Sequence, residues 1–337
     1  MLNLSDLLNI KILHDVNVQL WSSGVIRRIM SALNGADDDI YNRLYRQYVA
    51  GGTARQLKSL LVSVRDLNAA AYAKVTSMTS AELFAIAGVE VDWQDNAYKS
   101  NNLSAITQNQ AYSAALSRPF QGRLLNEALN EVGVARGNKI RNIIRVGYLT
   151  GKTTDALVRE IRGDLSVNNK NAAIEIDRRH LETVVRTAIS HTASTARELF
   201  INQNSELIKS QLWVSTLDSR TSGECIIRSG KRYTVGDNPK PINHETPWCG
   251  SGGCGPGRLH YNCRSSAVGL LEGQEALTGT RASSGGQIDA NTTYGEWLQS
   301  QSEYTKASVI NRGWISLDEL KKRDAGAFGA YNSVPAT

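Results

Sequence analysis

The chain has 337 residues, of which 41% are hydrophobic and 21% charged, and its formal net charge is +6 with a pI near 9.1. This length predicts one large domain or two ordinary ones, and the composition allows a sizeable buried core. No run approaches the roughly 20 uninterrupted apolar residues of a membrane span, and the N-terminus lacks the pattern of a signal peptide. We therefore expect a protein that is soluble and cytoplasmic when it is made, with no membrane partner.

The first two hundred residues have the periodicity of helices. Between positions 26 and 33, apolar residues recur at i, i+3, i+4 and i+7, which predicts one buried helical face. Gly35 is expected to end this helix, and Asp37 is expected to cap the next one. Residues 94–104 are mostly polar and predict a linker.

Two features punctuate the helices that follow. Pro119 must break or kink a helical pattern that runs over 105–132. Thr153 or Thr154 is the expected N-cap of a short helix that ends at Gly163. The sequence therefore predicts separate helices on each side of both features.

A long helix is predicted over about 174–209, and short strands follow it. His180 and His191 on this helix are expected to be partly exposed rather than ligands, and Trp213 is expected to pack against the helix. Composition changes at Gln211, after which short apolar and β-branched runs predict strands at 212–216, 231–235 and 263–270. The glycine-rich run over 250–257 predicts an irregular loop.

These patterns together predict an α+β fold. The N-terminal two-thirds is mostly α-helical, a small Cys/His-containing β-hairpin module spans 211–270, and a helical C-terminal extension follows, with helices near 294–301 and 315–322 and a disordered last dozen residues. We predict three consecutive regions: 1–100, which is helical, 101–275, which contains the β module, and 276–337, which is partly flexible.

All four cysteines lie within one short stretch, at Cys225, Cys249, Cys254 and Cys263, and His260 precedes the last by three positions. Zinc prefers about four sulfur and nitrogen ligands, so these five side chains are candidate zinc ligands, with His244 as a weaker sixth. Two other interpretations stay open: the cysteines could be free buried thiols, or they could form disulfides.

A polar turn comes directly after the first predicted strand. Asp218, Arg220 and Thr221 are expected to have a structural role there, because Asp side chains accept backbone N–H bonds in turns and an arginine can pair with a nearby carboxylate. A catalytic or ligand-contacting role for these residues is the less favoured interpretation.

A basic window without any acidic residue runs from Val132 to Thr154. Such a stripe could face phosphate or an acidic protein surface, although a solvated helix face is the simpler interpretation. The candidate basic surface consists of Arg136, Lys139, Arg141, Arg145 and Lys152.

The order of motifs over about 105–270 resembles the Mu F-like phage head morphogenesis family. The similar segments are VRTA at 185–188, LWVSTLDSRT at 212–221, Cys225, GK at 230–231 and LHYNCR at 259–264. The chain departs from the family at Ser222 and Ser265, where many members have cysteine, and at Tyr261, where proline is usual. Two customary sulfur positions are thereby lost, and Cys249 and Cys254 are candidates to replace them.

The resemblance implies a minor capsid protein of the virion that acts in head assembly and has no enzymatic activity. The implied partners are the portal protein, coat or scaffold protein and packaged DNA, at the head interior or portal vertex, with DNA ejection as a later stage. The alternatives are a metal-dependent nuclease that uses His244 or Asp218 as its base, or a nucleic-acid-binding protein outside the virion. The sequence lacks the common zinc-protease, HNH, P-loop and nucleophile-elbow motifs, which favours the assembly role.

Overall fold

The computed structural model describes residues 4–119, 121–163, 173–216, 220–274, 280–283, 286–289, 292, 297, 300 and 315–332. Its contacts divide the chain into two compact units. The first unit comprises Met1–Gly24, Leu83–Gly122 and Arg186–Thr337, and the second comprises Val25–Glu82 and Arg123–Val185. The division into consecutive regions at residues 100 and 275 stays a prediction.

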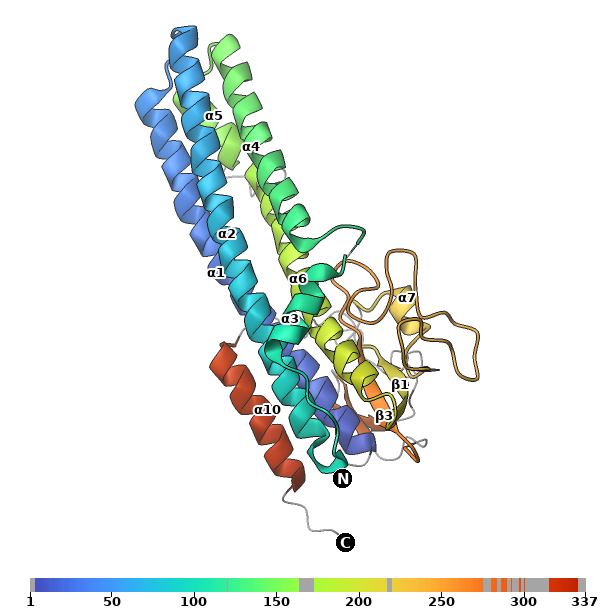
Figure 1. Cartoon of the computed structure of the whole chain (residues 1–337). Helices are drawn as coiled ribbons and strands as arrows, with labels where there is room; N and C mark the ends of the chain where they lie inside the picture. Colours follow the sequence, from blue (N-terminus) through green and yellow to red (C-terminus); the bar gives the residue numbers. More distant parts are fainter. Residues whose placement is uncertain are drawn as a thin grey trace. The chain divides into compact units, whose positions relative to one another are not determined.

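The predicted α+β class is confirmed, with helices dominating the described chain (Figure 1). Three of the four unit boundaries fall inside the long helices α1, α2 and α6, and the fourth, at Gly122, falls in the segment before residue 125. These helices span Leu4–Gln47, Ala54–Ala97 and Ala173–Gln203, respectively.

Helix α1 continues through Gly35, so the predicted helix end and the Asp37 cap are wrong. An interior glycine costs only about 1 kcal/mol, and burial of apolar residues on the same helix outweighs that cost. Leu33, Ile40 and Leu44 are all within 1% of complete burial. Asp37 is buried as well, where it accepts bonds from the guanidinium groups of Arg136 and Arg178.

The predicted linker at 94–104 is also shorter than expected, since α2 continues to Ala97. The short 3-10 helix η1 (Lys99–Asn101) follows, and Asn102 then adopts φ 52°, which ends it. Val91 and Trp93 belong to the buried core of the first unit, so α2 is stabilised here by packing that its polar composition does not reveal.

The second unit is an all-helical body in which α4 (Leu125–Leu149) and α5 (Thr154–Arg162) join parts of α1, α2 and α6. The expected cap at Thr153 is confirmed, because its hydroxyl accepts the Ala156 N–H at 3.2 Å. The helix ends at Gly163 with φ 88°, as the sequence predicts. The core of this unit includes Ile40, Leu44, Leu60, Val64, Ile140, Ile144, Leu157 and Ile161.

The first unit combines helices with a three-stranded antiparallel sheet in the order β2-β1-β3. The strands span Ile208–Val214, Arg232–Tyr233 and Ser266–Leu271 for β1, β2 and β3. Leu212 of β1 lies opposite Val268 of β3 and Arg232 of β2. We call residues 208–271 the β module. Its predicted strands are confirmed within a few residues.

The remaining elements of the first unit lie on both sides of the β module in sequence. Helix α3 (Gln108–Ser117) begins with a capping box between Thr107 and Gln110 and ends before Pro119, as expected. Strands β4 (Thr280–Ser283) and β5 (Gly286–Asp289) pair antiparallel. Helix α10 (Leu317–Asn332) begins close to the helix predicted at 315–322 but continues to Asn332, so the predicted disorder of the last dozen residues is wrong over 326–332, where Phe328 packs near Trp93. Most of the helix predicted at 294–301 and the last five residues lie outside the described residues.

A buried ionic cluster links α1, α2 and α10 within the first unit. The His14 Nδ1 lies 2.8 Å from Asp324 Oδ2, and its Nε2 lies 2.9 Å from Glu90 Oε1. Burial alone lowers the pKa of His14, but attraction to Glu90 and Asp324 outweighs this and raises it. Glu90 also accepts two bonds from the buried Arg197 at 2.7 and 2.9 Å. Each buried charge therefore has a partner of opposite sign.

Candidate metal centre

The first part of the centre is a short helix that follows β1. Helix α7 (Gly223–Ile226) begins at Ser222, whose hydroxyl accepts the Cys225 N–H at 3.3 Å. The same residue is held from the strand side, because Ser215 Oγ donates to the Cys225 carbonyl at 2.8 Å. Cys225 is thus placed at one end of the β module with only 2% of its surface exposed.

The second part is the loop that leads into β3. Asn262 adopts φ 57°, a left-handed conformation that asparagine tolerates, which allows the chain to turn between His260 and Cys263. The Asn262 N–H donates to Thr187 Oγ1 on α6 at 3.0 Å, and Thr216 Oγ1 donates to the Arg264 carbonyl at 3.2 Å. The long helix and the β1 end therefore fix this loop against α7.

Cys225, His260 and Cys263 meet, with all of their ligand atoms within 4.8 Å of one another. The two sulfur atoms are 3.7 Å apart, and Cys225 Sγ is 3.3 Å from His260 Nε2. Tetrahedral zinc with ordinary bond lengths would need a sulfur–sulfur separation of about 3.8 Å and a sulfur–nitrogen separation of about 3.6 Å. The spacing of these three groups therefore fits zinc.

His260 is oriented for metal binding by its other ring nitrogen. Its Nδ1 lies 2.8 Å from the Tyr261 carbonyl, which can only accept a hydrogen bond. This contact places the proton on Nδ1, so the neutral ring presents its Nε2 lone pair toward the sulfur atoms.

Cys225, His260 and Cys263 shift one another's pKa values. A hydrogen bond from Cys225 lowers the pKa of Cys263, and neighbouring His260 lowers it further against the effect of burial. The same hydrogen bond, with burial, raises the pKa of Cys225, and the hydrogen bond with Cys263 raises that of His260. The contacts therefore favour the thiolate at Cys263 over that at Cys225, and the thiolate is the form of cysteine that binds metal.

The two serines at customary sulfur positions also lie at this centre. Ser222 Oγ is 2.7 Å from His260 Nε2, and the hydroxyls of Ser222 and Ser265 both hydrogen-bond Cys225. A cavity of about 10 Å³, roughly one water molecule, opens beside them and is also lined by Arg220 and Thr221. The protein thus offers three strong ligands, a weak hydroxyl and space for one small species.

Cys249 and Cys254 do not add to this group, which corrects the five-ligand prediction. They form a disulfide with each other across a tight turn in which Gly250 N–H donates to Gly253 O at 2.8 Å. Their sulfur atoms are therefore not available as thiolate ligands. The disulfide interpretation applies to this pair, while Cys225 and Cys263 remain free thiols.

His244, the weaker sixth candidate, is occupied elsewhere. Its Nε2 lies 2.8 Å from the Arg232 carbonyl, and its Nδ1 accepts the Thr246 N–H at 3.2 Å. Both nitrogens therefore hold a turn beside Tyr233, against which the ring packs edge-on. This arrangement contradicts a role for His244 as ligand or base.

The predicted turn is described only in part. Asp218 lies outside the described residues. Arg220 is exposed, and Thr221 Oγ1 donates to the Thr216 carbonyl, which closes the turn as expected of a structural residue. Both residues line the small cavity of the centre, a position that the sequence did not reveal.

Arg228 has a structural role beside the centre that no sequence pattern indicated. It is 3% exposed and lies over the Trp213 ring at 5.7 Å. Its guanidinium donates to the carbonyls of Glu224, Pro247 and Cys249 at 2.6 to 2.9 Å. Arg228 therefore ties α7 to the disulfide loop through backbone oxygens, whose positions no sequence pattern reports.

Trp213 packs within the β module rather than against the long helix, which corrects that prediction. Its ring meets Trp248 edge-on with ring centres 5.2 Å apart, in a cluster that also contains Tyr233, Leu259 and both free cysteines. The candidate ligands Cys225 and Cys263 therefore lie beside an aromatic core, which excludes water from one side of them.

The predicted basic surface is partly wrong. Arg136 is 1% exposed and bonds Asp37 and Asn68, so it belongs to the interior of the second unit. Lys139 is 3.9 Å from Asp177, and Lys152 bonds Glu160 at 2.7 Å. Arg145 is exposed and Arg141 lines an open groove. Three of the five basic residues in the window without acidic residues therefore pair with a carboxylate in the folded chain.

Residues 138–268 match the family described as Phage Mu protein F like protein. No curated protein and no solved structure matches this chain. In the described part of the chain, no helix combines the length and apolar character that a membrane crossing requires. The family match includes the three metal-ligand candidates and confirms the resemblance to phage head proteins over that segment.

Proposed function

We propose that this protein is a minor component of a tailed-phage head that acts by placement during assembly, without enzymatic activity. It would bind the portal protein and coat or scaffold protein inside the assembling head, and it could contact packaged DNA. The observation that carries this proposal is the family match over residues 138–268. The match runs from the middle of α4 into β3, so it does not rest on a single motif.

We further propose that Cys225, His260 and Cys263 hold a structural zinc ion. Zinc would join α7 to the loop before β3, which are 35 or more residues apart in sequence. The ion would supply the cross-link, while Cys225, His260 and Cys263 would fix its position. The Ser222 hydroxyl or one water molecule would occupy the fourth position. Zinc sites that stabilise a fold are closed by four protein ligands, so the structural assignment requires the Ser222 hydroxyl, 2.7 Å from His260 Nε2, at the fourth position. Water at that position would instead give the open pattern of a catalytic site.

The assembly role is tested on particles. Virions of the phage that encodes this chain are purified, and their proteins are quantified by mass spectrometry. We expect the chain in mature heads at low copy number relative to coat protein, and we expect heads assembled without the gene to be defective. Its absence from both mature and immature heads would contradict the proposal.

The zinc site is tested by metal analysis of purified protein. We expect about one zinc ion per chain, since three strong ligands are present, and a loss of most of it in Cys225→Ser. The matched control is Cys249→Ser/Cys254→Ser, which removes two sulfur atoms from the same module and should keep its zinc. Equal zinc contents in all three proteins would refute the site.

A further inference from the structure

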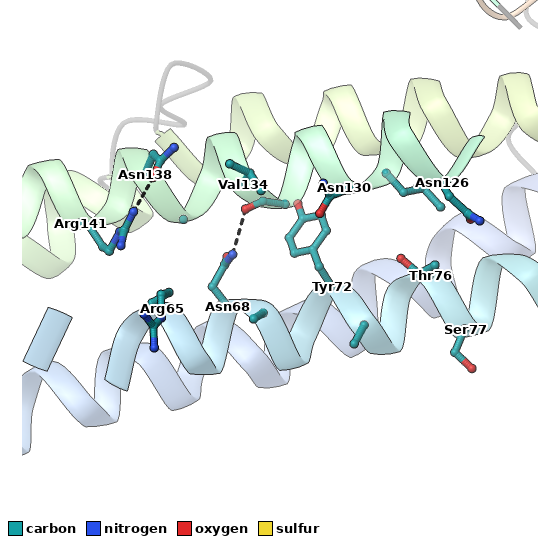
Figure 2. A pocket seen from close by; sticks show the side chains of 15 residues that line it. Arg65, Asn68, Tyr72, Thr76, Ser77, Asn126, Asn130, Val134, Asn138 and Arg141 are labelled. Carbon is teal, nitrogen blue, oxygen red and sulfur yellow. Dashed lines mark hydrogen bonds between the residues drawn. The ribbon is translucent and has the colours of Figure 1, made fainter. Parts of the chain in front are cut away.

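An open groove follows the facing sides of α2 and α4 within the second unit (Figure 2). Two adjoining hollows of about 760 and 250 Å³ share Arg65 and Arg141, so they form one continuous feature. The helices are antiparallel here, because Gly133 on α4 faces Tyr72 on α2, whereas Gly137, four positions later, faces Asn68, four positions earlier. Arg65 precedes Asn68 on α2, and Arg141 follows Gly133 on α4. Because the helices are antiparallel, the two arginines lie on the same side of the contact between Asn68 and Gly133.

The lining of the groove has helical spacing over a long distance. From Ala54 to Ser77, the α2 lining residues recur at intervals of three and four positions without a break. At 1.5 Å per residue, this face is about 35 Å long. Such a length suits an added helix of about 20 residues rather than a small molecule.

The floor of the groove is made of small side chains and one aromatic. Ala69 and Ala73 are exposed on α2, and Tyr72 projects between them toward α4 (Figure 2). A Cβ added at Gly133 would lie 2.7 Å from the Tyr72 ring, so the Tyr72 side chain needs the glycine opposite it. Val134 on the edge is 53% exposed. An apolar floor with exposed apolar edges is a surface into which an amphipathic helix docks.

The charge of the groove has a single sign. The charged residues that line it are Lys58, Arg65, Arg141 and Arg145, and no Asp or Glu is among the lining residues. All four lie along the half of the groove that runs from Ala54 to Arg65, while the rest of the lining is apolar or neutral amide and hydroxyl. Arg65 also forms an exposed ion pair of 2.9 Å with Asp66 beside the groove, and an exposed pair of this kind contributes little energy. The ligand is therefore expected to be apolar along its length and negatively charged at one end.

We propose that this groove binds an acidic amphipathic helix of another head protein. Its apolar side chains lie against the floor formed by Ala69, Tyr72 and Ala73, and its carboxylates meet the four cations. Duplex DNA fits less well, because it carries one charge per roughly 1.7 Å and would need cations along the whole groove. Only the source of the helix, another head protein, rests on the proposed function. Binding of an acidic helix can therefore be confirmed or refuted independently of the role in head assembly.

The test uses the purified full-length chain and three fluorescein-labelled 20-residue helical peptides. The peptides share an Ala/Leu face and carry Glu, Gln or Lys on the polar face, and binding is measured by fluorescence anisotropy. We expect the Glu peptide to bind about tenfold more tightly than the Gln peptide and the Lys peptide to bind most weakly. The preference should decline as salt is added, because it is electrostatic.

The variant Arg65→Glu/Arg141→Glu should abolish the preference for the Glu peptide. Its matched control is Arg46→Glu/Lys74→Glu, which makes the same charge change at exposed positions of the second unit outside the groove. Circular dichroism confirms that both variants fold. The control should bind the Glu peptide within about twofold of the original chain.

Three outcomes would overturn the proposal. The first is equal binding of the Glu and Gln peptides, or no binding of either. The second is an equal loss in both double variants, which would show that only net charge matters. The third is a 20-base-pair duplex, or a second copy of the chain in sedimentation, that binds more tightly than the Glu peptide and is lost in the groove variant. This last result would assign the groove to DNA or to self-association.

Discussion

The β module and the second unit are stabilised in different ways. The second unit buries many aliphatic side chains from five helices, whereas the core of the β module is a small aromatic cluster around Trp213. The β module compensates with specific links: the Cys249–Cys254 disulfide, the Arg228 bonds to three carbonyls and the Cys/His group. A small core needs such links because it buries too little apolar surface. The second unit should instead be sensitive to its few buried charges.

The largest single effect is expected at Asp37 in the second unit. Asp37→Ala would leave the buried guanidinium of Arg136 without its carboxylate, and removing one partner of a buried pair costs about 3–5 kcal/mol. Urea unfolding measures the loss. Asp38→Ala is the control, since its side chain is exposed one position away, and it should cost less than about 0.5 kcal/mol. Similar losses in both variants would show that helix propensity, and not the ion pair, determines the change in the free energy of unfolding.

A pH dependence is expected in the first unit from His191, which is buried rather than partly exposed as its sequence context predicts. Burial, with the nearby Arg258 charge, lowers the pKa of His191 to about 4. The unfolded chain, with a histidine pKa near 6.5, takes up a proton first as the pH falls. Stability contributed by neutral His191 is therefore present above about pH 6.5 and lost between pH 6.5 and 4, by about 3 kcal/mol in total.

The His191 effect is isolated by comparison with His191→Gln, which cannot titrate. Free energies of unfolding are measured at several pH values for both proteins. The difference between them should change by about 3 kcal/mol from pH 7 to pH 4, in favour of the variant at low pH. Parallel curves would mean that His191 does not titrate differently in the folded chain, and that carboxylates elsewhere dominate the acid response.

A smaller effect is expected from the disulfide of the β module. Cys249→Ser/Cys254→Ser opens a short loop, and loop-closure entropy predicts a loss of about 2 kcal/mol. The lost stability should appear in the near-ultraviolet signal of the Trp213 and Trp248 cluster, with little change in helix content. A loss of helix content in step with the tryptophan signal would show that the two regions unfold as one, which would remove the contrast drawn between them.

Much of the local structure follows from local chemistry. The helix break at Pro119, the Thr153 cap and the three strands of the β module depend on neighbouring residues, and the sequence predicts each of them. The sequence also placed Cys225, His260 and Cys263 among its candidate ligands, but it did not separate them from Cys249 and Cys254.

The wrong predictions have a common cause, because the residues that contact each other lie far apart along the chain. Arg136 lies in a window without acidic residues, but its carboxylate partner is 99 positions away at Asp37. Asp37 looked like a helix cap for the same reason. The Cys249–Cys254 pairing was left open because sequence spacing alone does not choose between a thiolate ligand and a disulfide.

The ionic contact between His14 and Asp324 has a consequence for the order of folding. It joins positions 310 residues apart, and Phe328 of the same helix α10 packs near the Trp93 ring. Asp324 can pair with His14 only after α10 has been synthesised, whereas the internal contacts of the second unit lie among residues 25–185. During translation, the second unit can reach its final packing while the first still waits for residues that have not been made.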